Sequence, residues 1–234
     1  MAHILLLRHG QASFGTHDYD RLSELGRRQS RLLGQHLQML GARFDAMYSG
    51  SLARQQDTAE HARRELGGEL PPLQVDAAFN EYDADGLFRA YLPRVLREDA
   101  ELAANAAQLF KSRKLFQQAF MAVTGLWLQG APPERGELEP WTAFEARVRE
   151  GLERINAAHG KDAQVAVFTS GGVIAAGVAL ALSLAPRDTL KLNWGIYNAS
   201  ITELGFRRSG TYLLGFNNIT HLRLAGDPAL ITHR

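Results

Sequence analysis

The residues with the clearest chemical potential stand near the start of the chain, where a short apolar run ends in Arg8-His9-Gly10. The run predicts a buried strand, and open α/β folds build their sites at the carboxyl ends of such strands. An imidazole can accept a phosphoryl group, and a guanidinium is the best side chain for a phosphate. Gly10 is expected to let the chain turn away with unusual dihedral angles. The pattern indicates a phosphate-handling site.

Three further segments follow predicted strands or lie close to their ends. Their sequences are Ser49-Gly50-Ser51-Leu52-Ala53-Arg54 and onward to Ala59, Asn80-Glu81-Tyr82, and Thr169-Ser170-Gly171-Gly172. Loops at the carboxyl ends of parallel strands converge on one crevice, so these segments are expected to meet there. Arg54 and Glu81 would then join His9. Phosphoryl transfer needs neutralised oxygens, good positioning and a proton for the leaving oxygen, and this set can provide all three.

The elements that must position these residues alternate between strands and helices. Predicted strands span His3–Arg8, Asp45–Ser49, Leu73–Asp76, Gln164–Thr169, Ser200–Arg207 and Thr211–Asn217. Predicted helices start at caps Ser23 and Ser51 and at Trp141 and Gly171, and a turn at Ser209-Gly210 joins the last two strands. This order predicts an α/β fold: a three-layer sandwich of a mostly parallel sheet with helices on both faces and an antiparallel edge strand.

The pattern changes after Glu81. From Asp83 to about Pro140 there are helical stretches, including Leu92–Leu102 and Leu109–Leu128, but no clear strand. A chain of 234 residues fits one large domain, with or without an inserted lobe. We predict a single domain over residues 1–234 with a helical cap inserted at about 83–140.

Composition excludes several classes of protein. Lys plus Arg is 26 and Asp plus Glu is 25, so net charge gives no case for binding nucleic acid or a membrane surface. Cysteine is absent, which excludes disulfides, thiol catalysis and thiolate metal sites. No signal peptide is recognisable, and the longest apolar run, Val173–Ala185, is too short for a membrane span. We expect a cytoplasmic protein.

Taken together, the segments resemble the histidine phosphatase superfamily in its phosphoglycerate mutase-like branch, over residues 3–81 and 141–222. Leu22-Ser23-Glu24-Leu25-Gly26 with Gln29 adds to the resemblance. The resemblance implies that His9 attacks phosphorus and carries a transient phosphohistidine. It implies that Arg8 and Arg54 hold the phosphoryl oxygens, and that Glu81 protonates the leaving oxygen and then takes a proton from water. Gln11 stands where relatives often have Glu, and its amide is expected to bind ligand oxygens or to orient the loop.

The resemblance departs at Ser170, where the family normally has a second His before a Gly. A hydroxyl donates only a neutral hydrogen bond, and losing one such contact costs roughly 10²–10³ in rate by analogy with oxyanion-hole deletions. Ser170 has two open roles, helix cap or phosphate contact, and the N–H groups near Gly171 are further phosphate-binding candidates. His17 and His221 are auxiliary candidates, with a structural role favoured for His221.

The favoured function is phosphoric monoester hydrolysis without a metal or cofactor, on a phosphorylated small molecule or a phosphoprotein. The alternative is a weakly active or inactive member of the family that binds a phosphorylated ligand or partner, which Ser170 favours. A phosphomutase is less favoured, because no residue indicates that the phosphoenzyme survives while an intermediate turns around. Exposed sheet edges and an apolar cap make a homodimer an expectation.

Overall fold

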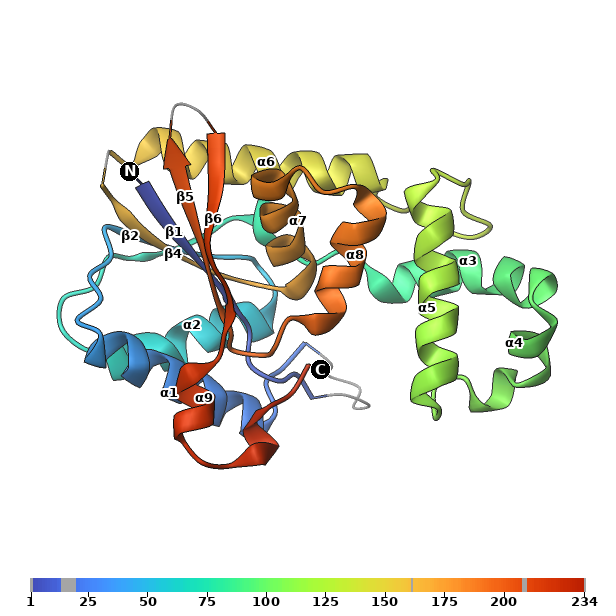
Figure 1. The fold of residues 1–234 in the computed structure, drawn as a ribbon, viewed down its shortest axis with the longest axis horizontal. Helices are drawn as coiled ribbons and strands as arrows, with labels where there is room; N and C mark the ends of the chain where they lie inside the picture. Colours follow the sequence, from blue (N-terminus) through green and yellow to red (C-terminus); the bar gives the residue numbers. More distant parts are fainter. Residues whose placement is uncertain (1, 14–19, 161, 208–209, 234) are drawn as a thin grey trace. The chain divides into compact units, whose positions relative to one another are not determined.

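A computed structural model describes residues 2–13, 20–160, 162–207 and 210–233 of the chain. The chain forms two compact units, one of residues 1–81 and 147–234 and one of residues 82–146. The first unit holds the sheet and all of the strands described (Figure 1).

The sheet of the first unit has six strands. They are β1 (Ala2–Arg8), β2 (Ala46–Ser49), β3 (Leu73–Val75), β4 (Gln164–Thr169), β5 (Ile201–Arg207) and β6 (Gly210–Asn218), in the order β3-β2-β4-β1-β5-β6. β3, β2, β4 and β1 pair in parallel, whereas β5 is antiparallel to both β1 and β6. The α/β fold is confirmed in this mixed sheet. The strand that runs against the others is β5, inside the sheet, and β6 forms the edge.

Helices cover both faces of this sheet, as predicted. On one face lie α1 (Glu24–Met39), α2 (Ala53–Leu66) and α9 (Thr220–Leu224), whose side chains share a buried cluster with Leu7 of β1. On the other face, α7 (Gly171–Leu182) packs beside Leu6, close to Leu152 of α6 (Trp141–Ala158). Leu6 and Leu7 are both fully buried because the central strand is covered on both sides.

Several helix ends differ from the predictions. Ser23 caps α1 as expected, its hydroxyl accepting from the Gly26 N–H. Ser51 does not cap α2: the N-cap position falls on Leu52, and the Ser51 hydroxyl accepts from the Asn80 side-chain amide at 2.8 Å instead. The helices α8 (Pro186–Gly195) and α9 were not predicted. Pro186 is the first residue of α8, a position where the missing N–H of a proline costs nothing. In the predicted last turn, Ser209 lies outside the described residues.

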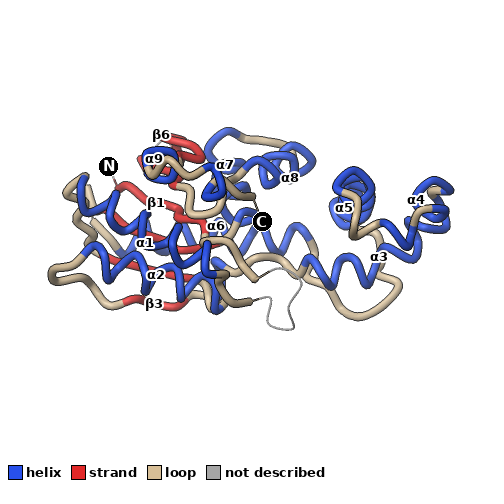
Figure 2. The backbone as a smooth tube through the Cα atoms, turned by 90° about the horizontal axis from the view of Figure 1, so that it is seen from below, coloured by secondary structure: helices blue, strands red, loops and turns tan. Residues whose placement is uncertain are grey.

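The second unit contains helices and connecting loops (Figure 2). Its helices are α3 (Ala84–Glu98), α4 (Ala100–Ala104) and α5 (Arg113–Leu128), followed by the start of α6. The predicted helix Leu92–Leu102 is interrupted, because the Asp99 carboxylate accepts from the Leu102 N–H at 3.0 Å and so caps a new helix. Within the described ranges, no helix has both the length and the apolar character needed to cross a membrane.

Candidate active site

His9 follows β1 directly and is 6% exposed. Its backbone N–H donates to the Thr169 carbonyl of β4 at 2.9 Å, which fixes the residue between the two central strands. The ring Nδ1 lies 2.7 Å from the Gly10 carbonyl oxygen. A carbonyl only accepts, so Nδ1 carries the hydrogen and Nε2 keeps its lone pair. Nε2 accepts from the Arg54 Nε–H at 3.3 Å.

The surroundings of His9 keep its ring neutral. Burial is the main reason that the pKa of His9 lies well below its ordinary value, and the charges of Arg54 and Arg8 lower it further. The hydrogen bond to the Gly10 carbonyl opposes this change but does not reverse it. A neutral imidazole with a lone pair on Nε2 is the form that can attack phosphorus.

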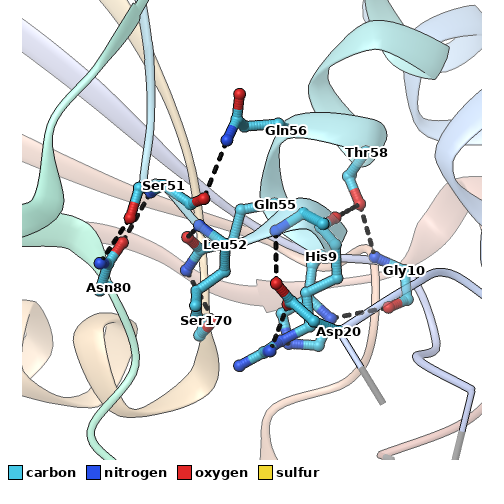
Figure 3. Close-up of polar contacts among 12 residues, drawn as sticks. His9, Gly10, Asp20, Ser51, Leu52, Gln55, Gln56, Thr58, Asn80 and Ser170 are labelled. Atoms are coloured by element: carbon cyan, nitrogen blue, oxygen red, sulfur yellow. Dashed lines mark hydrogen bonds and ion pairs between the residues drawn. The ribbon is translucent and has the colours of Figure 1, made fainter. Parts of the chain in front are cut away.

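Arg54 is the second residue of α2 and is buried. Besides its contact with His9, it donates from Nη1 to the Asp20 carboxylate at 2.7 Å. The other oxygen of that carboxylate accepts from the Ala53 N–H at 2.7 Å, one of the N–H groups that a helix start leaves unsatisfied (Figure 3). Sequence reasoning missed Asp20 as a site residue, since only the fold brings its loop to the start of α2.

Arg8 reaches the start of α7 from the end of β1. Its guanidinium donates to the backbone carbonyls of Ile196 and, at 2.8 Å, His233. A Cβ placed on Gly171 would lie 3.6 Å from the Arg8 Nε and 2.3 Å from the Asn193 side-chain oxygen. Gly171 is therefore needed for this close packing, and the Arg8 side chain lies beside it at the start of α7.

The prediction that Gly10 is needed for unusual dihedral angles is wrong. Its φ is not among the positive values found in the described chain. A Cβ there would instead lie 2.3 Å from the Gly26 carbonyl oxygen, so the glycine allows the loop to approach the first turn of α1. The Gly10 N–H donates to the Thr58 hydroxyl of α2 at 3.1 Å, which ties the loop to a second helix.

Gln11 also binds the start of α1. Its amide oxygen accepts from the Ser23 hydroxyl at 2.9 Å, and its backbone N–H donates to the Gln29 side-chain oxygen at 2.8 Å. Of the two predicted roles, these contacts favour orientation of the loop. A contact with ligand oxygens stays a prediction.

Glu81 faces the start of α7. One carboxylate oxygen accepts from the Gly172 N–H at 3.1 Å, a position where the helix favours negative charge. The preceding Asn80 is held on both sides, since its side-chain oxygen accepts from the Ser51 N–H at 2.7 Å and its carbonyl accepts from Arg147 at 2.9 Å. Glu81 is thus brought to the same helix end as Arg8.

Ser170 occupies the N-cap position of α7, but its side chain makes no capping hydrogen bond, so that predicted role is wrong. Its hydroxyl oxygen accepts from the Gln55 side-chain amide at 2.8 Å. Ser170 is 0% exposed, buried beside a residue that the sequence did not indicate. Its contact with phosphate stays a prediction.

The two auxiliary candidates have different outcomes. His221 lies in α9 and is buried, and its ring stacks on that of His36 in α1 with centroids 5.3 Å apart. This packing favours the structural role. His17 lies outside the described residues.

The α/β fold and the buried His9 with the guanidiniums of Arg8 and Arg54 indicate a phosphoryl-transfer protein. Comparison with known proteins agrees. The family model of the histidine phosphatase superfamily (branch 1) matches residues 4–108 and 101–219. The chain therefore belongs to the histidine phosphatase superfamily.

Curated relatives include phosphoglycerate mutases. The chain is 28% identical over 187 residues to the 2,3-bisphosphoglycerate-dependent phosphoglycerate mutase of Methylobacterium sp. (strain 4-46), which covers 73% of this chain and 81% of the relative. The enzyme of the same name from Bartonella quintana (strain Toulouse) is 31% identical over 86 residues, or 34% of this chain. The match spans 42% of that relative's length.

Solved structures of similar fold include phosphatases. Bacillus stearothermophilus YhfR aligns with a TM-score of 0.67 at 21% identity, over 94% of this chain and 99% of that one. The mycobacterial glucosyl-3-phosphoglycerate phosphatase in complex with VO3 aligns with a TM-score of 0.63 at 23% identity, over 93% of this chain and 99% of that one. At these identities the likeness shows the fold.

Proposed function

We propose that the chain hydrolyses phosphoric monoesters through a phosphohistidine at His9. The observation that carries the proposal is the buried, neutral imidazole whose Nε2 lone pair faces the Arg54 guanidinium. Attack forms a bond from Nε2 to phosphorus and breaks the ester P–O bond. The Arg54 N–H that now donates to Nε2 then donates to a phosphoryl oxygen, and Arg8 adds a second positive charge.

Glu81 completes the cycle. Its carboxyl group gives a proton to the departing oxygen, so that an alcohol leaves instead of an alkoxide. The resulting carboxylate takes a proton from water, which attacks phosphorus and releases inorganic phosphate and free His9. The contact of Glu81 with the Gly172 N–H places its side chain at the helix end that Arg8 also reaches, where the carboxylate form that takes the proton from water is favoured.

Hydrolysis requires only water as the second acceptor. A mutase must in addition hold the dephosphorylated intermediate while it turns around. The superfamily neighbours include the mycobacterial phosphatase as well as the mutases, which supports phosphoryl transfer to and from His9 in either case. We infer a substrate that is a phosphorylated small molecule or a phosphoprotein.

A second candidate function is the binding of a phosphorylated ligand or partner without turnover. Ser170 favours it, since a hydroxyl already bonded to Gln55 supplies no positive charge to the transferring group. The neutral Nε2 of His9 favours the enzyme, because binding alone would not require a nucleophile.

Rapid quench of the reaction with ³²P-labelled phenyl phosphate tests the proposal. The wild type should turn over and accumulate an acid-labile, alkali-stable phosphoenzyme, and His9→Gln should lose both. His61→Gln, a change of the same kind on the outer part of α2, is the control and should keep both. A wild type that binds phosphate but shows no turnover would support the binding protein. Turnover by His9→Gln would show that another group is the nucleophile.

A further inference from the structure

Gln55 connects three segments of the candidate site. Its side-chain N–H groups donate to the Ser170 hydroxyl at 2.8 Å and to the Phe79 carbonyl at 3.0 Å. Its amide oxygen accepts from the Leu52 N–H at 3.3 Å. The carbonyl can only accept and the backbone N–H can only donate, so the orientation of the amide is fixed. Gln55 is 0% exposed, and Figure 3 shows its side chain between the start of α2 and Ser170.

The Phe79 carbonyl accepts two side-chain hydrogen bonds. The Thr169 hydroxyl donates to it at 2.7 Å, in addition to Gln55. All three of these residues are fully buried, where an unsatisfied polar group costs free energy. The junction of β4 and α7 therefore holds the chain two residues before Glu81.

The same junction also holds the Glu81 carboxylate. The Gly172 N–H donates to it at 3.1 Å, while Thr169 and Ser170 lie at the other end of the short junction. The β4–α7 junction thus holds both the backbone before Glu81 and the Glu81 carboxylate itself. Gln55, which follows Arg54 in α2, links the β4–α7 junction and the chain before Glu81 to that helix.

We propose that Gln55 is a positioning residue for Glu81, acting through the Phe79 carbonyl and the Ser170 hydroxyl. The inference rests on the proposed function, in which Glu81 protonates the leaving oxygen. Proton transfer depends on hydrogen-bond geometry, so a small displacement of the carboxyl group slows it. Removing the Gln55 amide leaves the buried Ser170 hydroxyl without its donor and the Phe79 carbonyl with one donor fewer.

Gln55→Met tests this inference, because it keeps the volume of the side chain and removes its hydrogen bonds. The matched control is Gln56→Met, since Gln56 is the next residue of α2 and its amide donates to the backbone carbonyl of the exposed residue Ser51 at 2.9 Å. Two aryl phosphates that differ in their leaving group separate positioning of Glu81 from a general structural effect. Phenolate needs a proton to leave from phenyl phosphate, whereas the dinitrophenolate of 2,4-dinitrophenyl phosphate does not.

The quantity to compare is kcat/KM, which reports phosphorylation of His9 and not the later reaction with water. General acid catalysis contributes 10²–10⁴-fold, so Gln55→Met should lower kcat/KM about 10-fold or more for phenyl phosphate and less than about 2-fold for 2,4-dinitrophenyl phosphate. Gln56→Met should change neither value. Equal losses on the two substrates, or no loss on either, would overturn the inference.

A second measurement does not depend on activity. Exchange of the Gly172 amide hydrogen, followed by NMR in the same three proteins, reports whether its contact with Glu81 is kept. Gln55→Met should speed this exchange and Gln56→Met should not. If the wild type turns over neither substrate, the hydrolase proposal fails, and faster exchange still supports the positioning of Glu81 by Gln55. Unchanged exchange would overturn that positioning whatever the kinetics.

Discussion

Acid is expected to weaken the native state through His221. Burial, followed by the nearby His36, lowers the pKa of His221 from 6.5 to about 4, although a contact with the Ala199 backbone acts in the opposite direction. Between these two values the unfolded chain binds a proton that the native chain does not. Above pH 6.5, His221 is neutral in both states and does not change the free energy of unfolding. As the pH drops from 6.5 toward 4, the free energy of unfolding decreases.

The size of this effect follows from the difference between the two pKa values. A difference of about 2.5 pH units at about 1.4 kcal/mol each gives about 3.5 kcal/mol in full. About 3 kcal/mol of this is lost between pH 7.5 and pH 4, because at pH 4 the native His221 is itself half protonated. His221→Phe should remove this loss, because a phenyl ring keeps the stacking on His36 and does not titrate. Urea denaturation of both proteins across this pH range measures the two curves.

The difference between the curves reports the titration of His221 together with its charge interaction with His36. Other histidines with a lowered pKa, His9 and His61 among them, titrate in both proteins and cancel in the comparison. The wild type should lose about 3 kcal/mol more than His221→Phe on acidification. Parallel curves would refute the reasoning, since they would mean that His221 takes its proton as easily in the native state as in the unfolded chain.

Three further predictions concern the loop of His9 and its partners. Arg54→Lys keeps the charge but cannot serve both His9 and Asp20, so kcat/KM for phenyl phosphate should fall roughly 10²–10³-fold, as for other lost preorganised donors, in steady-state assays. Gly10→Ala brings a methyl group against the Gly26 carbonyl and should cost about 1–3 kcal/mol in urea denaturation; an unchanged midpoint would contradict the packing argument. NMR of ¹⁵N-labelled His9 should show the neutral Nδ1–H form still present below pH 6.5, and titration at 6.5 would contradict its lowered pKa.

The meeting of His9 with Arg54 was predictable from the sequence. Both follow buried strands that are apolar and short, and parallel strands bring their carboxyl ends to one edge. Glu81 was predictable for a related reason, because its segment follows the third parallel strand. The fold class followed from the same alternation of strands and helices.

Asp20 and Gln55 could not be predicted in the same way. Asp20 contacts the Ala53 N–H and Arg54 at the start of α2, and Gln55 contacts Ser170 and the Phe79 carbonyl. These contacts cross the fold, and none of them has a local sequence pattern. Gly10 shows a related limit: the residue type was noticed, but its reason is a neighbouring carbonyl of α1 and not its own dihedral angles.

Contacts that the sequence does not reveal also change the interpretation of Ser170, which stands where the family normally has a second His. From sequence, Ser170 is a His position that lacks its charge. In the fold, the space beside the hydroxyl is filled by the Gln55 amide, and no surface of either residue is exposed. An imidazole at position 170 would therefore have to displace Gln55 and, with it, a donor to the Phe79 carbonyl. The two positions therefore have to be considered as one unit. Arg8 and the helix N–H groups supply positive charge at this end of α7.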